Sequence, residues 1–122
     1  MIRLQSKTTF NIFDEESIFY RLVDTKTKSY IGKCELSKET WKDGVVYVLW
    51  SVKIFEEFQN MGYGNLMLKR VLNRNQNTDI PIFLYVYKSN TIALHLYEKL
   101  GFKIVKDCED AWMMQQKNRK VR

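Results

Sequence analysis

The chain has 122 residues, of which 45% are hydrophobic, 14% aromatic and 28% charged. This composition is typical of one globular domain and excludes disorder along the whole length. The net charge of +6 favours an anionic partner, and nucleic acid, an acidic substrate or a phosphate-rich cofactor would all satisfy it. No apolar run is long enough to cross a bilayer.

The two ends of the chain bear on location and partners. Residues 1–7 lack the apolar stretch and the small-residue cleavage site of a secretory signal, so we expect a cytoplasmic protein that does not bind membranes. Four of the last six residues are basic, which predicts a solvated tail, with a nucleic-acid contact as the alternative. These residues are Lys117, Arg119, Lys120 and Arg122.

The cysteines and the histidine predict no metal site. Cys34 and Cys108 are far apart and lack the spacing of metal ligands, so we expect two free, buried thiols. His95 is the only histidine. Its neighbours Leu96 and Tyr97 belong to the inward side of a predicted helix, which predicts a surface position for the imidazole.

The order of apolar and polar runs predicts one domain over residues 1–122, because no repeat, low-complexity tract or linker divides the sequence. Residues 17–24 and 29–36 are β-branched and aromatic runs around a polar turn, which predicts an antiparallel hairpin. Residues 45–54 and 82–87 contain nearly unbroken apolar runs, typical of central strands that are covered on both faces.

An amphipathic helix is predicted between the two central strands. Leu68, Val71 and Leu72 fall at helical spacing, while basic and amide side chains take the other side. Strand, helix and strand in this order predict a right-handed parallel crossover.

A second helix and a closing hairpin complete the predicted fold. The helix runs from Thr91 to Leu100, and Gly101 supplies a left-handed stop. Residues 102–105 and 111–115 predict two short strands around a polar turn. The predicted fold class is mixed α/β (α+β).

Residues 59–64, with the sequence Gln-Asn-Met-Gly-Tyr-Gly, lie directly between the first central strand and its helix. Backbone N–H groups at this place are not yet committed to intrahelical bonds and can point at an anion. Gly62 and Gly64 lack the Cβ atoms that would keep a pyrophosphate away, so the loop predicts a diphosphate site, with a plain turn as the alternative. No Gly-Lys-Ser/Thr follows, which disfavours a nucleoside triphosphate.

The second helix begins with a further motif. Asn90, Ala93 and Tyr97 are spaced to share one side of it, although Asn90 alone predicts a helix cap and Tyr97 alone a packed side chain. Together with the glycine loop, this motif resembles the signature segments of the GNAT superfamily of N-acetyltransferases. The segments read Ile54-x-x-Glu57-Phe58-Gln59-x-x-Gly62-x-Gly64 and Asn90-x-x-Ala93-x-x-Leu96-Tyr97-Glu98-Lys99-Leu100-Gly101-Phe102.

The resemblance covers about residues 45–105 and implies an acetyl-coenzyme A-binding core. In the family, two central parallel strands splay apart and hold the pantetheine arm, and the amides of the glycine loop bind the pyrophosphate. Carried over to this sequence, the expected cofactor-binding residues are Val52, Ile54, Gln59, Asn60, Met61, Gly62, Tyr63, Gly64, Asn65, Asn90, Ala93 and Tyr97.

The implied chemistry is direct attack of a primary amine on the thioester through a tetrahedral intermediate, with no metal. Backbone N–H groups at residues 52–54 could stabilise the oxyanion. Tyr97 would be the catalytic residue, because a positioned phenol can donate a hydrogen bond or a proton to the departing sulfur. Many family members also carry a glutamate base inside the first central strand, but the corresponding position here is about Val48.

No replacement for that base is evident in the sequence. Glu35, Glu56 and Glu57 are the nearest carboxylates, and we expect each to be a solvated surface group. A water chain or an already neutral amine would also serve. We expect Trp41, Trp50 and Trp112 to pack in the core or the cleft rather than to form a recognition box, and Trp50 could flank the acceptor.

The family usually has a strand and two helices before its antiparallel hairpin, whereas only residues 1–16 precede the hairpin here. This shortened N-terminal helical region predicts an open acceptor side, suited to a peptide, a protein or a polyamine-like amine. We therefore expect an acetyl-coenzyme A-dependent N-acetyltransferase that acts as a monomer or homodimer. The alternative is a non-catalytic acyl-coenzyme A-binding or interaction module with the same fold; nucleic acid is not the expected partner.

Overall fold

The computed structural model describes residues 1–116, which form a seven-stranded sheet, two α-helices and one short 3-10 helix. In chain order the elements are β1 (Ile2–Phe10), β2 (Glu16–Asp24), β3 (Ser29–Trp41), β4 (Gly44–Ile54), η1 (Glu56–Phe58), α1 (Tyr63–Arg74), β5 (Ile82–Tyr87), α2 (Thr91–Lys99), β6 (Phe102–Cys108) and β7 (Ala111–Gln116). The predicted basic tail of Lys117, Arg119, Lys120 and Arg122 lies outside the described residues.

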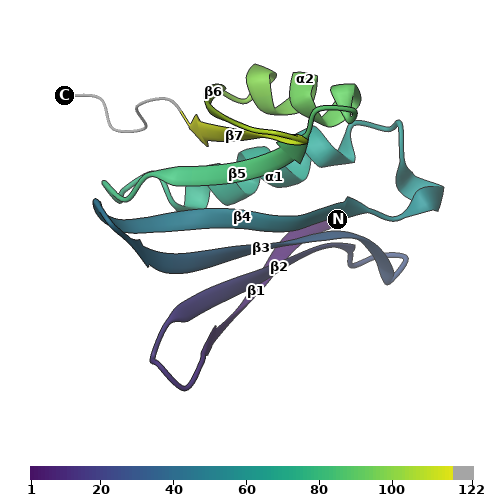
Figure 1. The fold of residues 1–122 in the computed structure, drawn as a ribbon. Coiled ribbons are helices and arrows are strands. Elements are labelled where there is room, and N and C mark those ends of the chain that lie inside the picture. Colours follow the sequence, from purple (N-terminus) through teal and green to yellow (C-terminus); the bar gives the residue numbers. More distant parts are fainter. Residues whose placement is uncertain (117–122) are drawn as a thin grey trace.

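The strands are arranged in the order β1-β2-β3-β4-β5-β7-β6, and only β4 and β5 are parallel neighbours (Figure 1). The predicted mixed fold class, both hairpins and both helices are confirmed. Two strands are longer than predicted, since β3 continues through residues 37–41 and β6 through residues 106–108. The polar residues 37–41 extend β3 because they pair with the apolar start of β4.

The N-terminal segment, for which the sequence predicts no element, forms a strand. β1 pairs with β2 over its whole length, from Ile2 opposite Asp24 to Phe10 opposite Glu16. Leu4 is its buried residue and joins the core. Within the described residues no helix precedes β2, as the shortened N-terminal region predicted.

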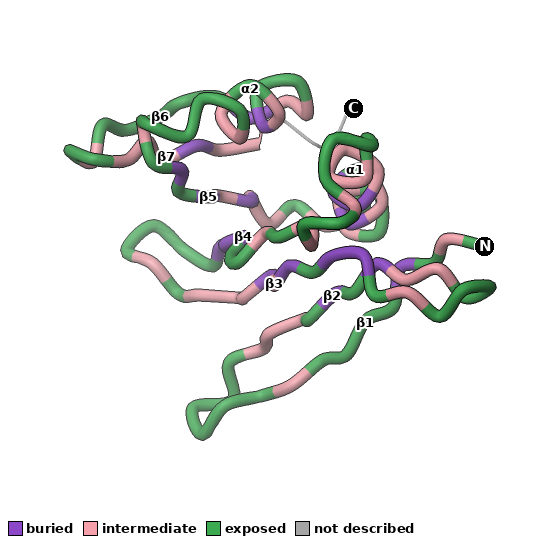
Figure 2. The backbone as a smooth tube through the Cα atoms, turned by 90° about the vertical axis from the view of Figure 1, so that its right-hand side faces the viewer, coloured by how far each residue is buried: buried purple, intermediate pink, exposed green. Residues whose placement is uncertain are grey.

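Both helices lie on the same face of the sheet, behind it in Figure 1, and Figure 2 shows α1 to the right of β4 and α2 above β7. The connections β4-α1-β5 and β5-α2-β6 step across the sheet in the same direction, and right-handed crossovers then place both helices on one side. Met67, Leu68 and Val71 of α1 and Tyr97 of α2 are buried against this face. Among the described residues no helix covers the opposite face.

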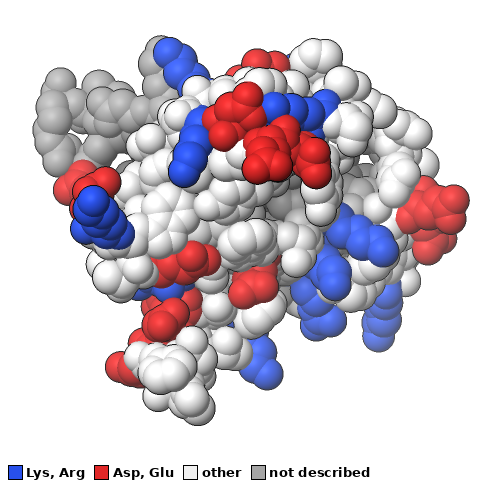
Figure 3. Space-filling view, viewed as in Figure 1, with Lys and Arg blue, Asp and Glu red and all other residues white. Residues whose placement is uncertain are grey.

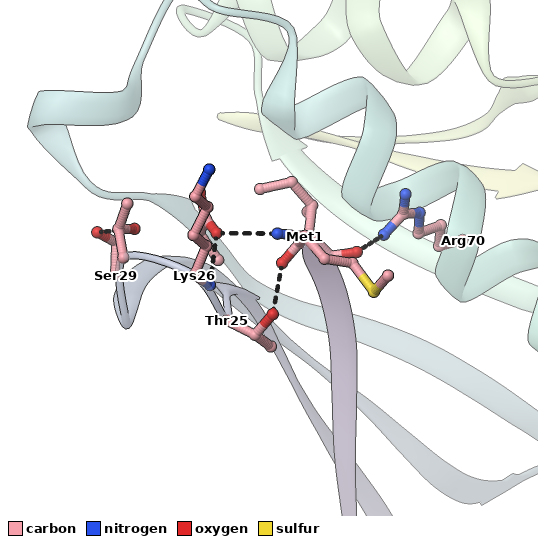
Figure 4. A network of polar contacts seen from close by, with 8 residues as sticks. Met1, Thr25, Lys26, Ser29 and Arg70 are labelled. Carbon is pink, nitrogen blue, oxygen red and sulfur yellow. Dashed lines mark hydrogen bonds and ion pairs between the residues drawn. The ribbon is translucent and has the colours of Figure 1, made fainter.

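α1 is also tied to the edge of the sheet through backbone carbonyls of β1. The Arg70 Nη1 group donates to the Ile2 carbonyl at 2.8 Å (Figure 4). The Arg74 guanidinium donates to the Leu4 carbonyl. The Met1 ammonium lies 3.3 Å from Oδ1 of Asp24, so the start of β1 is held from two sides. These contacts anchor β1 in the absence of the usual N-terminal helices.

The central parallel pair is joined along only part of its length. Tyr47, Val48 and Leu49 pair with residues 82–84, after which β4 continues to Ile54 without a partner in β5. Beyond the last pair, Ser51 has φ 54° and the register with β3 shifts, which marks a β-bulge that bends β4. The predicted splay of the two central strands is therefore confirmed.

Gly32 of β3 lies against the end of β4. A Cβ atom built on it would come within 2.5 Å of Ile54 Cδ1 and 2.7 Å of the Lys53 carbonyl oxygen. The carbonyl belongs to the backbone and cannot rotate away like a side chain. The close approach of the two strands at this point therefore requires glycine.

We predict that Gly32→Ala lowers the free energy of unfolding by about 1–3 kcal/mol, the usual cost of overpacking. Denaturant unfolding of the two proteins measures the change. Lys33→Ala, at the next and exposed position of β3, is the control and should change stability by less than about 0.5 kcal/mol. Equal stability of Gly32→Ala and the parent protein would show that the contact is not tight.

Candidate functional site

The loop between β4 and α1 carries the first predicted motif and holds two residues in the left-handed region. Asn60 has φ 63° and Gly62 has φ 83°. The family commonly has glycine at the Asn60 position, and asparagine is among the few other residues that tolerate this conformation. Gln59 Nε2 donates to the Ile54 carbonyl at 2.9 Å, which ties the loop to the end of β4. The replacement at position 60 thus preserves the backbone conformation.

The N-terminus of α1 is open and its first amides are available. The first intrahelical bond runs from the Leu66 N–H to the Gly62 carbonyl at 3.1 Å, so the amides of residues 63–65 precede it. The first turn contains no acidic side chain, and nothing lies within 4 Å of the place that a Cβ on Gly62 would take. Asn65 Oδ1 is buried without a hydrogen-bond partner among residues 1–116. The open amides and the absence of an acidic side chain fit a diphosphate at the positive end of the helix, whereas the Asn65 oxygen is an acceptor and needs a donor instead.

The structure brings the glycine loop, the end of β4 and α2 together. A Cβ on Gly64 would lie 3.5 Å from Leu96 Cδ2 and 3.8 Å from Ile54 Cγ1. Val52 and Ile54 are expected to line the gap between β4 and β5. Both are half-buried on the end of β4 that has no partner in β5. The other predicted loop residues lie beside them, with Met61 exposed and Tyr63 half-buried.

Asn90 caps α2, as its position predicted. Its Oδ1 accepts from the Ala93 N–H at 3.2 Å, and its own N–H donates to the Tyr87 carbonyl at 2.9 Å. The side chain is exposed, and its NH₂ group makes no hydrogen bond to another described residue. The cap thus uses only the oxygen of the side-chain amide.

Tyr97 is buried in the core, with 8% of its surface exposed. Its ring packs edge-to-face on Phe102, with centroids 6.0 Å apart. Burial raises the pKa of Tyr97 to about 12, and the nearby Cys34 thiol adds to the shift. Burial likewise raises the pKa of Cys34 to about 12. The phenol therefore keeps its proton throughout the neutral range and can act as a donor.

Three carboxylates near the gap were expected to be exposed, and two of them are. Glu56 and Glu57 of η1 are exposed, which confirms the prediction of surface groups, but Glu35 is half-buried on β3 opposite Trp50. Glu35 is less exposed than predicted because β3 is paired on both sides there, with Phe19 of β2 and Trp50 of β4 opposite Glu35. Val48 is fully buried, so that position carries no acid.

Glu39 is a polar residue of this region that the sequence-based reasoning did not find. Its Oε1 accepts from Trp41 Nε1 at 3.1 Å, and its Oε2 accepts from Trp50 Nε1 at 3.2 Å. Ser37 Oγ donates to the same Oε2 at 2.9 Å. The available signal was the alternation of Ser37, Glu39 and Trp41, which places all three on one face of a strand.

The remaining predictions concern groups outside the gap. His95 is exposed, as expected, and Cys34 is buried and free. The prediction of burial is wrong for Cys108, which is half-buried because it ends an edge strand. Within residues 1–116 there is no group of three or more potential metal ligands, and no helix there has the length and apolar character to span a membrane.

Solved structures with the same fold include several acetyltransferases. The spermidine N-acetyltransferase of Vibrio cholerae, in complex with coenzyme A and spermine, has a TM-score of 0.70 at 23% identity, covering 84% of this chain and 68% of that one. The ribosomal-protein-S18-alanine N-acetyltransferase of Escherichia coli has a TM-score of 0.68 at 18% identity, with coverages of 87% and 72%. Arabidopsis thaliana NAA60, in complex with a bisubstrate analogue, has a TM-score of 0.65 at 12% identity, covering 81% of this chain and 74% of that one.

The sequence itself also has relatives. An N-alpha-acetyltransferase of Sulfurisphaera tokodaii is 34% identical over 52% of this chain and 44% of its own length, so the match spans less than half of that relative. The family described as FR47-like protein matches residues 27–113, which run from the turn before β3 into β7. With the splayed central strands and the open glycine loop, this match shows that the chain belongs to the FR47-like family of GNAT N-acetyltransferases.

Proposed function

We propose that this protein transfers the acetyl group of acetyl-coenzyme A to a primary amine of a peptide, protein or polyamine-like acceptor. The observation that carries the proposal is that the open amides at the start of α1 lie beside Leu96 of α2 and the end of β4, which has no partner in β5. The Sulfurisphaera relative is named an N-alpha-acetyltransferase, and the Vibrio structure holds coenzyme A and spermine, which supports an amine acceptor.

The residues of the loop and of α2 would bind the cofactor in an extended form. Amides of residues 60–65 would bind the diphosphate, where the α1 dipole adds about half a positive charge. Val52 and Ile54 would line the pantetheine arm, because β4 has no strand partner in β5 at that level. The Asn90 NH₂ group is placed to donate to the same arm, while Gln59 supports the loop through Ile54.

Tyr97 would act on the sulfur side of the reaction. When bound, acetyl-coenzyme A supplies an activated acetyl group and a thiol leaving group, whose pKa is about 8.5 by analogy with cysteine. The pKa of Tyr97 is about 12 before the cofactor binds, so full proton transfer to the thiolate is uphill. A hydrogen bond from the phenol to the developing thiolate is the more favourable contribution. Backbone N–H groups at residues 52–54 would stabilise the oxyanion.

Two measurements test the proposal as a whole. Calorimetric titration with acetyl-coenzyme A should show binding to the protein, and mixing with acetyl-coenzyme A and an amine panel should release free thiol. The panel contains spermidine, lysine-containing peptides and peptides with free N-termini. Absence of binding would refute the cofactor site, and binding without thiol release across the panel would refute acetyl transfer.

The Gly64→Ala variant separates the binding role of the glycine from its structural role. The added Cβ makes only ordinary contacts, and alanine is favoured over glycine inside a helix by about 0.5–1 kcal/mol. We predict unchanged or higher thermal stability, but roughly tenfold weaker acetyl-coenzyme A binding, because the methyl group enters the gap between Ile54 and Leu96. Asn73→Ala, on the exposed side of α1, is the control for calorimetry.

The Asn90→Ser variant separates capping from cofactor binding. Serine caps helices about as well as asparagine, so stability should change by less than about 0.5 kcal/mol. The variant lacks the NH₂ group, and we predict about a fivefold loss of acetyl-coenzyme A affinity, which corresponds to one hydrogen bond. Unaltered affinity, measured by calorimetry, would mean that Asn90 only caps α2.

The Tyr97→Phe variant tests the hydroxyl. The ring and its contact with Phe102 are kept, so folding and cofactor affinity should remain within about twofold. We predict that the rate of thiol release at saturating substrates falls roughly 10²-fold, within the range for positioned acids. If the rate is unchanged while product release is shown to be fast, Tyr97 has no role on the sulfur.

A further inference from the structure

The face of the sheet away from the helices bears an aromatic surface. Trp41 lies against Phe83 with ring centroids 4.8 Å apart, and Trp50 stacks on Tyr85 with centroids 5.7 Å apart. Figure 3 shows this face with uncharged surface over its middle and acidic side chains over β3. Among residues 1–116 no helix covers these rings, and Trp50 is 39% exposed.

A single carboxylate is fixed between the two indoles. Glu39 accepts from Trp41 Nε1 through one oxygen, and from Trp50 Nε1 and Ser37 Oγ through the other. Ser37 Oγ in turn accepts from Trp50 Nε1 at 2.9 Å, so the group is a connected network. The pKa of Tyr85 is raised by burial and further by anionic neighbours that include Glu39, so the carboxylate acts on that phenol as well.

This carboxylate lies next to the position where the family pattern has its acid. In the β3–β4 register Ser37 is opposite Val48 and Glu39 is opposite Val46. Val48 is fully buried although no helix covers its face among the described residues. Val48 lies one residue before the end of the β4–β5 pairing, and Glu35 and Glu39 occupy the two diagonal positions on the neighbouring strand. Of these two carboxylates, Glu39 is the one that both indoles hold.

The charge of Glu39 has no cation beside it within the described residues. The two ion pairs found there involve other groups, Met1 with Asp24 and Lys88 with Asp107. Its three donors are neutral and leave room for a further hydrogen bond, since a carboxylate offers about four acceptor positions. A half-buried anion beside tryptophan and tyrosine rings favours a cation that can also lie against an aromatic face.

We propose that Glu39, Trp41 and Trp50 form the site that binds the protonated amine of the acceptor. An ammonium group offers three donors to the Glu39 carboxylate, and the rings provide the faces for cation–π contact. The indole N–H groups hold the carboxylate in one orientation, so little is lost in ordering it when the amine binds. This proposal rests on the proposed function, of which it names the acceptor-binding residues.

The kinetic test uses Glu39→Gln with spermidine and tri-alanine as acceptors. Loss of a charged hydrogen bond should raise the KM for each amine roughly ten- to hundredfold, while acetyl-coenzyme A affinity stays within about twofold. The matched control is Glu35→Gln, which removes a half-buried carboxylate from the same strand and face and should change the KM by less than about threefold. An equal effect of the two variants, or none of Glu39→Gln, overturns the proposal.

A binding measurement without turnover separates this proposal from the proposed function. In a Trp112→Phe background, the fluorescence of Trp41 and Trp50 should change on titration with tri-alanine. It should not change with N-acetyl-tri-alanine, which lacks the positively charged N-terminal ammonium. The change should require Glu39. If this binding occurs while no acetyl transfer is found, the amine site stands and the proposed reaction fails. If acetyl transfer occurs but tri-alanine does not alter the fluorescence, the proposed amine site is wrong.

A second variant tests the proposal independently, in case Glu39→Gln does not fold. Trp50→Phe keeps a ring against Tyr85 but removes the N–H that holds Glu39, and should raise the KM for amines about threefold to tenfold. Circular dichroism and acetyl-coenzyme A calorimetry confirm that each variant is folded. A folded Trp50→Phe protein with unchanged KM would contradict the role of the indole in fixing the carboxylate.

Discussion

The separation of β4 from β5 is the constraint on which the rest of the site depends. A strand that leaves its neighbour inside a sheet exposes backbone N–H and carbonyl groups, which must find other partners. Part of the answer is local, because Gln59 Nε2 donates to the Ile54 carbonyl and Phe55 N–H donates to the Ile31 carbonyl. The bulge at Ser51 bends β4 at the same level. The remaining groups along the gap are those that an extended ligand could pair with.

The direction of the two crossovers decides which surfaces are left for the substrates. Because both helices lie on one face, the start of α1 meets Leu96 of α2 on that side of the gap. The other face keeps only the side chains of its own strands as cover, and Val46 and Val48 are buried there without a helix among the described residues. A thioester in the gap would thus be reached by the acceptor from the face opposite the helices.

Much of this arrangement could be predicted from the sequence. The spacing of apolar residues indicates the helices and the central strands, and two short motifs indicate the loop and the start of α2. The capping role of Asn90 and the burial of Tyr97 follow directly from their positions in an amphipathic helix. β1 and residues 37–41 of β3 were missed, because their polar composition gives weak strand signals that only pairing with β2 and β4 overrides. The Glu39 network was missed for the same reason, since it requires the register between β3 and β4.

The net charge of the protein affects the binding of the two proposed ligands in opposite ways. The chain carries +6, which attracts the phosphates of coenzyme A but repels an amine that is protonated at neutral pH. Salt screens charges beyond about 8 Å, so the repulsion from distant lysines and arginines is weak at the acceptor face. Local groups then decide whether an ammonium binds. A fixed carboxylate among aromatic rings reverses the sign of the field over a few residues, while the open amides at α1 favour the anionic cofactor on the other side of the sheet.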